Sequence, residues 1–540
     1  MLGPRGQPVG SPSRASQGAL DLTDRQIMAR NIKPRSEDYA QWYLDVIKAA
    51  ELADHSPVRG CMVIRPEGFA IWEAISADLD ARFKETGHVN ACFPLLIPQS
   101  FLTKEAEHVE GFAMECAVVT HSKLSKGSDG TLHPAGKLEE PLIVRPTSET
   151  VIGHMYSQWI QSYRDLPVLI NQWANVMRWE MRTRLFLRTS EFLWQEGHTA
   201  HETAEEAQEE TLRMLDVYAD FAEESLALPV IKGLKTEAEK FPGADATYTI
   251  EGLMQDGKAL QCGTSHNLGQ NFSKAFDIDF LGRDNKQHLA WTTSWGVSTR
   301  LIGAMIMAHS DDDGLVIPPR VAPVVATIIP IWRKDEDRAQ VAEYIDTLLE
   351  RLVGADELAA SKKRLAAGDL HSVFFDKHTH QRIVVDWRAV RPGDKQFHWE
   401  QRGVPFRIEV GPRDVEKQAM VVKSRLDRKD KRFVDRDELS HEWLEGLLED
   451  SHSQLKERAR VFRDASIHEA SSYAELQAVL DEHGGFVRCF FEQDPAREKT
   501  IQEETKATVR CIPFEQSGKS GPCIITGQET TTEVLFARAY

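Results

Sequence analysis

The sequence predicts an α+β protein built from more than one domain. Its 540 residues exceed the length of one ordinary domain, so about two to four domains are expected. In the first 300 residues, two strand-like segments joined by a short basic loop indicate an antiparallel pair. Beyond residues 316–320 the pattern changes to alternating strands and helices, which is typical of an α/β domain.

The hydrophobic spacing predicts the elements of the first part. Phe69, Trp72, Ile75, Leu79 and Phe83 recur every three or four residues, which predicts a long amphipathic helix over 68–83. An apolar strand interrupted by Pro94 is expected at 89–98, at a sheet edge or a bulge. Further strands are predicted at 169–179, 189–194, 246–250 and 259–267, and further helices after residue 202 and at 299–309.

The same reasoning covers the rest of the chain. Strands are predicted at 324–330, 382–386 and 406–410, and helices at 335–352 and 437–466. Residues 351–381 fit a helical insertion of unassigned purpose. Residues 1–20 are rich in Gly, Pro and Ser and are predicted to be a disordered extension; a transit peptide fits less well because no amphipathic pattern develops. The predicted division is 1–20, 21–318, 319–436 and 437–540.

The bulk composition excludes several protein classes. Hydrophobic residues make up 41% and charged residues 27% of the chain, which is typical of a globular protein. No apolar run reaches 18 residues and the N-terminus lacks the apolar core of a secretory signal, so a cytoplasmic location is expected. The net charge, 65 − 83 = −18, argues against loose coating of RNA but leaves room for a local basic footprint. The seven cysteines contain no Cys-x-x-Cys pair and predict reduced thiols.

The most informative motif is a basic hairpin between residues 178 and 196. Arg178 and Glu180 lie two residues apart on a predicted strand, so both side chains point to the same face. Arg188 follows the loop, and the aromatic Phe192 comes four residues later. Arginine is suited to a phosphate under attack, because its planar fork binds two oxygens at once. A surface hairpin with solvated charges explains one Arg-x-Glu pair but not the further motifs.

This hairpin resembles the second motif of class II aminoacyl-tRNA synthetases. Residues 294–300 resemble the third motif, and Pro94 after the long helix resembles the first, which builds a dimer interface. Residues 145–149, 192–198 and 261–272 are similar to segments of prolyl-tRNA synthetases of the archaeal and eukaryotic type, and the similarity runs from about residue 21 to the C-terminus.

The resemblance implies both the architecture and the activity. It implies an antiparallel catalytic domain, an α/β anticodon-binding domain and a small α/β C-terminal domain. The implied enzyme is a homodimer that uses ATP and Mg²⁺ to join L-proline to tRNA(Pro). The final Tyr540 would reach back toward the catalytic domain.

The resemblance also assigns residues to the site. The catalytic set is Arg178, Arg188 and Arg300. The ATP-binding set is Arg178, Glu180, Arg188, Thr189, Phe192, Gln261, Thr264 and Arg300. The proline-binding set is Thr147, Glu149, Arg178, Trp194, Glu196, His198, His266 and Ser294. The chemistry agrees, because a secondary ammonium needs an acceptor carboxylate and a pyrrolidine ring suits an aromatic wall.

Several alternatives accompany these assignments. His198 and His201 could form a metal pair, but no third ligand is evident. Trp194 could be a core residue rather than a pocket residue. Many relatives bind zinc in the C-terminal domain through four cysteines, but Thr526 stands where a partner of Cys523 would fall, so no structural zinc is expected.

The remaining expectations concern tRNA and fidelity. Arg382, Arg388, Lys395 and Arg402 are candidate phosphate contacts, although each alone could be a solvated charge. The 97 residues 197–293 leave little room for an inserted editing domain, so misactivation of alanine or cysteine is expected. The rival functions are a synthetase for threonine or serine and a catalytically silent, synthetase-like tRNA-binding protein.

Overall fold

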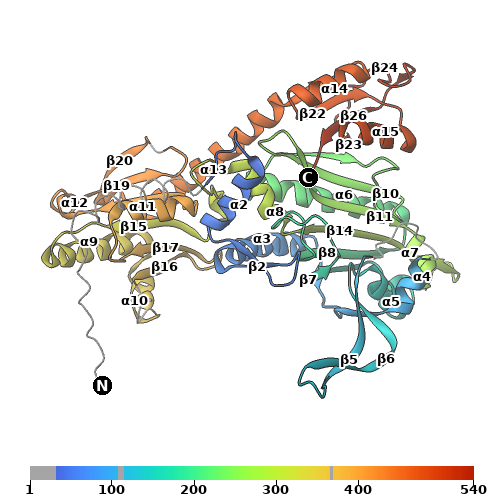
Figure 1. Ribbon diagram of the computed structural model, residues 1–540, viewed down its shortest axis with the longest axis horizontal. Helices are drawn as coiled ribbons and strands as arrows, with labels where there is room; N and C mark the ends of the chain where they lie inside the picture. The colour runs from blue at the N-terminus through green and yellow to red at the C-terminus, as the bar shows by residue number, and fades with distance from the viewer. Residues whose placement is uncertain (1–31, 107–114, 365–368, 428) are drawn as a thin grey trace, which may run out of the picture.

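The computed structural model describes residues 32–106, 115–364, 369–427 and 429–540, so the predicted extension at 1–20 lies outside the described residues. The fold is α+β, as predicted, with one large, mostly antiparallel sheet and a second, mixed sheet (Figure 1). Within the described ranges, no helix combines the length and the apolar content that crossing a membrane requires.

The large sheet contains eleven strands in the order β21-β22-β26-β23-β9-β10-β11-β14-β8-β7-β3. Its middle strands are β7 (Val168–Met177), β8 (Glu191–His201), β9 (Val230–Leu234), β10 (Ala246–Leu253), β11 (Ala259–Gly269) and β14 (Trp291–Ser298). The neighbouring pairs among them are antiparallel, as the hairpin motif predicted.

Three helices pack against this sheet: α3 (Pro66–Glu85), α6 (Ala204–Glu224) and α8 (Arg300–His309). Phe83 of α3, Tyr218 of α6 and Trp295 of β14 form a buried aromatic cluster, with ring centroids 5.0–6.2 Å apart. The predicted helix at 68–83 is confirmed as the central part of α3. The apolar residues that recur along α3 form one face of the helix, and this face is buried in the core.

The single strand predicted over 89–98 is wrong. The segment forms two short strands in different sheets, β3 (Val89–Asn90) and β4 (Leu96–Pro98). β3 pairs with β7 at the edge of the large sheet, and Pro94 follows where that ladder has ended. A proline has no N–H to extend such a ladder, so the chain turns to a second pairing. β4 joins β5 (Ala117–Lys126) and β6 (Leu132–Val144) in a separate sheet, whose long β5–β6 hairpin projects from the body of the molecule (Figure 1).

Two helices flank this small sheet, α4 (Gln99–Ala106) and α5 (Glu149–Trp159), and α5 packs on α7 (Asn271–Phe276). β12 (Asp279–Leu281) and β13 (Gln287–Leu289) form a further hairpin. Near the start of the described chain, α2 (Tyr39–Ala49) precedes the pair β1 (Ala53–His55) and β2 (Met62–Ile64).

The second sheet has the order β16-β17-β15-β18-β19-β20. Its strands are β15 (Val324–Pro330), β16 (Leu370–Asp376), β17 (Gln381–Asp386), β18 (Phe406–Val410), β19 (Ala419–Ser424) and β20 (Lys431–Asp435). Its helices are α9 (Asp335–Val353), α10 (Ala355–Arg364), α11 (Pro392–Gln401) and α12 (Pro412–Glu416). β15 runs parallel to both of its neighbours, which confirms the predicted α/β pattern.

The helical insertion predicted over 351–381 is only partly confirmed. α10 accounts for its first half, but β16 pairs antiparallel with β17 and forms the sheet edge. The buried side chains of Val373 and Phe375 alternate with less buried neighbours, which is a strand period that the sequence prediction overlooked.

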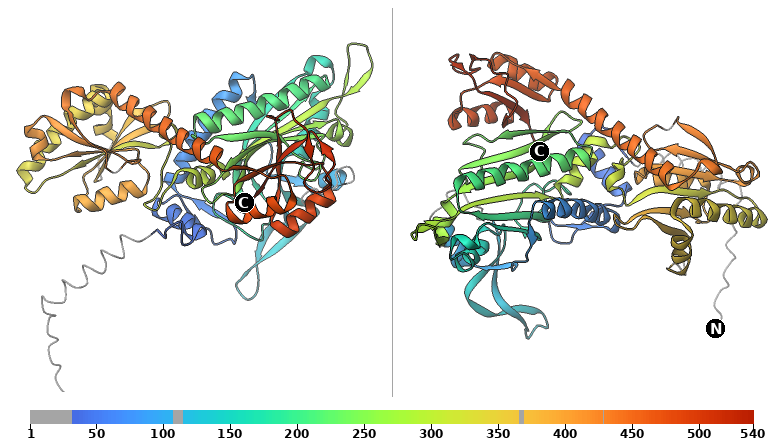
Figure 2. Two further views of the ribbon diagram at one scale, coloured as in Figure 1. Left: turned by 90° about the horizontal axis from the view of Figure 1, so that it is seen from above. Right: turned by 180° about the vertical axis from the view of Figure 1, so that it is seen from behind.

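The long helix α13 (His441–Ala465) runs from the second sheet toward the C-terminal strands (Figure 2). The C-terminal part contains β21 (Ile467–Glu469), α14 (Tyr473–Glu482), β22 (Phe486–Phe490), α15 (Pro495–Thr505), β23 (Ala507–Pro513), β24 (Gly521–Pro522), β25 (Glu529–Thr530) and β26 (Glu533–Arg538). β23 pairs with β9, so these strands continue the large sheet. Tyr540 lies against the β10–β11 turn, where its hydroxyl donates to Asp256 Oδ2 at 2.6 Å, as the resemblance implies.

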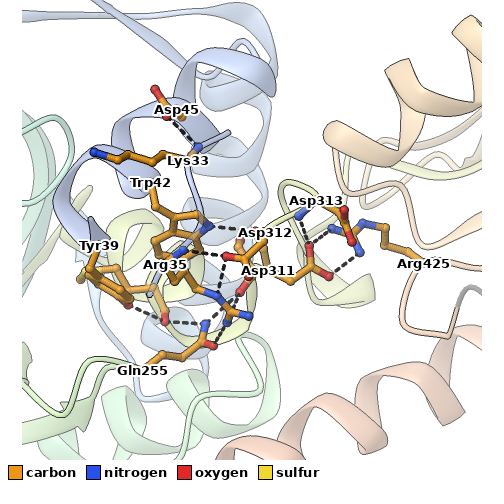
Figure 3. Close-up of polar contacts among 12 residues, drawn as sticks. Lys33, Arg35, Tyr39, Trp42, Asp45, Gln255, Asp311, Asp312, Asp313 and Arg425 are labelled. Carbon is orange, nitrogen blue, oxygen red and sulfur yellow. Dashed lines mark hydrogen bonds and ion pairs between the residues drawn. The ribbon is translucent and has the colours of Figure 1, made fainter. Parts of the chain in front are cut away.

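A polar junction joins the segment that follows α8 to the second sheet and to the N-terminal part of the described chain (Figure 3). Arg425, just after β19, donates to both carboxylate oxygens of Asp311 at 2.8 and 2.6 Å. The Asp311 carbonyl accepts a hydrogen bond from Trp42 Nε1 at 2.8 Å, and Arg35 donates to the neighbouring Asp312 at 3.0 Å. Since α8 begins with Arg300, this junction also supports the helix that carries a predicted site residue.

Candidate active site

A cavity of about 360 Å³ lies on the face of the large sheet opposite α6. All of the residues predicted for the site line this cavity: Thr147, Glu149, Arg178, Glu180, Arg188, Thr189, Phe192, Trp194, Glu196, His198, Gln261, Thr264, His266, Ser294 and Arg300. The structure therefore brings together residues that lie up to 153 positions apart, 300 − 147, in the sequence. Their individual roles stay predictions.

Strand β8 carries four of these side chains on one face. Phe192, Trp194, Glu196 and His198 alternate along the strand and line the cavity, because successive side chains of a strand point to opposite faces. The intervening Gln195 accepts a hydrogen bond from the hydroxyl of Tyr218 in α6, on the other face.

The strand period separates His198 from His201. The two residues lie three positions apart, so their side chains point to opposite faces of β8 rather than to the same side of a helix. His201 bonds Thr199 Oγ1 at 2.7 Å and does not line the cavity. The pair is therefore not arranged as a shared metal site. In the described part of the chain, no group of three or more His, Cys, Asp or Glu side chains is placed to hold a metal ion.

A bulge in β11 decides which of its side chains reach the cavity. The pairing with β10 passes from Gly263 to Gln261 and skips Cys262. The extra residue shifts the period, so that Gln261 and Thr264, three positions apart, both line the cavity.

The backbone at Gly197 has no room for a side chain. A Cβ atom there would lie 2.1 Å from the indole of Trp295, which crosses the strand at this point. Gly197 thus lets the core aromatic pack directly beneath the cavity-facing Glu196 and His198.

Glu196 is the centre of a buried hydrogen-bond network. Its Oε1 accepts from Ser148 Oγ at 2.5 Å and from Gln172 Nε2 at 2.6 Å, and its Oε2 lies 3.0 Å from His198 Nε2. Burial disfavours the charged forms of both Glu196 and His198. The hydrogen bond between the two groups and their opposite charges favour the charged forms more strongly than burial disfavours them. They lower the pKa of Glu196 and raise the pKa of His198, so the two form an ion pair.

We expect His198→Gln to weaken the fold in a pH-dependent way. The raised pKa of His198 contributes stability that is fully present below its unfolded value of about 6.5 and is lost as pH rises through the folded value. The free-energy gap between wild type and variant should be about 1–2 kcal/mol at pH 6 and should shrink toward pH 9. Urea unfolding at both pH values measures it, with exposed His55→Gln as control; a gap that grows with pH would contradict the ion pair.

The three predicted catalytic arginines approach the cavity from three elements. Arg178, which follows β7, donates from Nε to the Pro146 carbonyl at 2.9 Å, and its guanidinium carbon lies 5.7 and 5.5 Å from the ring centroids of Phe192 and Trp194. Arg188 donates to Glu180 at 2.6 Å and keeps 60% of its side chain exposed. Burial lowers the pKa of Arg300, and the nearby positive charges of Arg178 and Arg188 lower it further. Positive charge is thus concentrated without a full set of anionic partners.

The polar groups of the cavity include one bonded pair and two atoms without a partner among the described residues. The hydroxyl of Thr147 donates to Glu149 Oε2 at the start of α5. Trp194 Nε1 and Ser294 Oγ are buried, and no hydrogen-bond partner for them exists among the described residues. A buried polar atom without a partner is unfavourable, so both favour a ligand that completes their hydrogen bonds.

The loop between β9 and β10 was missed by the sequence prediction. Glu239, Lys240, Phe241 and Pro242 line the cavity, and the Phe241 ring lies 4.7 Å from that of His266. Burial lowers the pKa of His266 to about 3, so this imidazole is neutral at physiological pH. The only sequence signal was the position of this loop between two predicted site strands.

Three of the four basic residues predicted to contact tRNA phosphates already have partners within the protein. Arg388 donates to both Asp386 oxygens at 2.9 and 2.6 Å, and the buried Lys395 donates to the Asp386 carbonyl at 2.7 Å. Arg402 pairs with Glu51. Neither Lys395 nor Arg402 is a solvated surface charge, so phosphate binding would require these bonds to rearrange.

Comparison with known protein families agrees with this architecture. A model of the tRNA synthetase class II core domain (G, H, P, S and T) matches residues 135–309, and an anticodon binding domain matches residues 326–445. A model described as the prolyl-tRNA synthetase C-terminal region matches residues 473–540. The fold and the site therefore define a class II aminoacyl-tRNA synthetase.

Comparison with individual proteins shows which family of this class the chain belongs to. The chain is 52% identical to the proline–tRNA ligase of Bacteroides fragilis over 523 residues, which cover 95% of this chain and 100% of that protein. It is 53% identical to the enzyme of Roseiflexus sp. and 54% identical to that of Chloroflexus aurantiacus, each over 94% of this chain and 99% of the relative. The chain belongs to the proline–tRNA ligase family.

Proposed function

We propose that the cavity binds ATP and L-proline side by side and that the chain charges tRNA(Pro) through a prolyl-adenylate. The observation that carries this proposal is the convergence of Arg178, Arg188 and Arg300 in one cavity with Glu149 and Trp194. Guanidinium groups suit a polyphosphate, whereas a carboxylate and an indole suit a cyclic ammonium ion.

In the first step, a carboxylate oxygen of proline attacks the α-phosphorus of ATP. A new O–P bond forms, the bond to the β-phosphate oxygen breaks, and pyrophosphate leaves with Mg²⁺. The nucleophile is already ionised at neutral pH, so no protein base is needed. Arg178 would hold the α-phosphate and the proline carboxylate, Arg188 the γ-phosphate, and Arg300 the remaining phosphate charge.

The other cavity residues would orient the two substrates. Phe192 would stack on the adenine, which Glu180 reads at its edge, while Thr189, Gln261 and Thr264 bind the rest of the nucleotide. Thr147 and Glu149 would bind the imino group of proline. Trp194, Glu196, His198, His266 and Ser294 would surround its ring, in keeping with the neutral state of His266.

Proline-dependent exchange between pyrophosphate and ATP tests this function. Exchange should require proline and should be far weaker with threonine or serine at equal concentration. No exchange together with normal tRNA binding would favour the alternative of a catalytically silent tRNA-binding protein. Exchange driven by threonine or serine would show that the enzyme activates that amino acid instead of proline.

In the second step, the 3′-terminal hydroxyl of the tRNA attacks the adenylate carbonyl and releases AMP. We infer that bases of the anticodon stack near Trp332 and Trp387, which lie at the carboxyl ends of the parallel strands β15 and β17. Their ring centroids are 5.9 Å apart, and Arg338 lies 5.4 Å from the first ring. An aromatic pair beside a cation favours unpaired bases.

Replacing Trp332 by alanine should raise the KM for tRNA about 5- to 150-fold, since loss of one stacked base costs about 1–3 kcal/mol. Proline-dependent exchange, which needs no tRNA, should stay at the wild-type rate. Aminoacylation kinetics measure the first quantity. Phe433→Ala, which removes an aromatic ring that is 73% exposed elsewhere on the same sheet, is the matched control.

Four further expectations belong to this proposal. The exposed apolar side chains of Val89, Leu95 and Leu96 follow α3 and support a homodimer through this edge, which sedimentation would detect.

Misactivation of alanine or cysteine is proposed because residues 197–293 form the site strands and their connections; hydrolysis of mischarged alanyl-tRNA by this chain alone would overturn it. We also propose a cytoplasmic location and no structural zinc, and stoichiometric zinc in the purified protein would refute the latter.

A further inference from the structure

The loop between β9 and β10 forms one wall of the cavity, and its position is coupled to His266. Phe241 N–H donates to Thr247 Oγ1 at 2.9 Å, and the same oxygen lies 3.0 Å from His266 Nδ1. The Phe241 ring also packs on the imidazole. A displacement of this loop would therefore change both the shape of the wall and the placement of His266.

The loop begins at a fully buried threonine. The carbonyl of Thr236 accepts the N–H groups of Glu239 at 3.0 Å and Lys240 at 2.9 Å, so the first turn of the loop is built on this residue. Its hydroxyl donates to Glu498 Oε2 at 2.6 Å. Glu498 belongs to α15, so a side chain of the C-terminal part holds the base of the cavity wall.

A buried ion cluster fixes β23, the strand on which α15 packs, next to the start of the loop. Lys235 Nζ, one residue before the threonine, lies 2.8 Å from Glu251 Oε1 and donates to the Arg510 carbonyl at 2.7 Å. The Arg510 guanidinium lies 3.0 Å from Glu251 Oε2, and all three side chains are buried. Together with the backbone pairing of β23 and β9, these bonds keep the C-terminal part from sliding along the loop.

A glutamate is an unusual residue at a buried position such as 498. Its side chain is buried, and its Oε1 has no hydrogen-bond partner among the described residues. Burial raises the pKa of this carboxyl, and the negative charges of Glu239 and Asp494 raise it further. An apolar residue would fill the same space without these penalties, so packing alone does not account for the carboxyl.

We propose that Glu498 is a positioning residue for proline binding: through Thr236 it holds the loop that carries Phe241 against His266. This inference rests on the proposed function of the cavity. It assigns to the C-terminal part of the chain a role in the first step of the reaction, across 262 residues of sequence.

Steady-state pyrophosphate exchange with the full chain tests the proposal. Glu498→Ala should raise the KM for proline about five- to tenfold, while kcat and the KM for ATP stay within about twofold of wild type. Glu498→Gln should restore the KM for proline, because its amide oxygen accepts the same hydrogen bond. Glu503→Ala, an exposed position on the same helix, should have no effect.

A second pair of variants approaches the contact from the loop. Thr236→Val removes the hydroxyl at nearly equal volume and should match Glu498→Ala, whereas Thr236→Ser should stay near wild type. If Glu498→Ala does not fold, the two Thr236 variants still test whether the contact between Thr236 and Glu498 positions the loop.

Three results would overturn the proposal: an unchanged KM for proline in Glu498→Ala, an equal loss in Glu498→Gln, or a parallel rise in the KM for ATP. Each is distinct from failure of the proposed function, in which the wild-type chain itself would show no proline-dependent exchange.

Discussion

Replacing Arg178 by alanine is expected to reduce proline-dependent pyrophosphate exchange by about 10³-fold or more. The guanidinium lies against Phe192 and Trp194 and is held by the Pro146 carbonyl, so it is oriented before substrate arrives. Removing one oriented charge donor from a developing phosphate charge typically costs a factor of about 10²–10³, and Arg178 would also hold the proline carboxylate.

Arg178→Lys is the informative companion. Lysine keeps the positive charge but not the planar fork, so it should recover only part of the lost rate. Arg213→Ala, on the other face of the sheet in α6, should leave exchange unchanged. Near-normal exchange in Arg178→Ala would remove this residue from its assigned role.

Replacing Glu149 by glutamine is expected to raise the KM for proline about 100-fold or more. Glu149 is a buried carboxylate that lines the cavity, and the substitution removes its charge at constant size. Loss of one member of a buried charge pair costs about 3–5 kcal/mol, and here the second member would be the substrate ammonium.

The KM for ATP should change little in Glu149→Gln, because the predicted nucleotide-binding residues lie on other elements than α5. Glu139→Gln on the exposed surface of β6 provides the matched control. A normal KM for proline in Glu149→Gln would assign recognition of the imino group to another residue. Isothermal titration with proline alone would separate binding from catalysis.

Many local features of this protein could be predicted from the sequence. The helix α3 follows from its apolar spacing, and β15, β17 and β18 follow from runs of β-branched residues bounded by turns. These features depend on the side-chain period of a single element, which the sequence carries directly. The family resemblance added every predicted cavity residue.

Other features depend on partners that are distant in the chain. The separation of β3 from β4 depends on which edge each strand meets, and the bulge at Cys262 arises from pairing with β10. The contribution of Phe241 to the cavity could not be foreseen, because nothing local distinguishes its loop from an ordinary connection.

By itself, the sequence determined the class of fold, the order of the domains and the set of candidate groups for binding phosphate and proline. Only the tertiary structure decided how those groups meet and what holds them. The contact between Thr236 and Glu498 illustrates the reason. Hydrogen bonds act over about 3 Å, whereas sequence periodicity carries information over a few residues, so a bond across 262 positions exists only once the sheet has assembled.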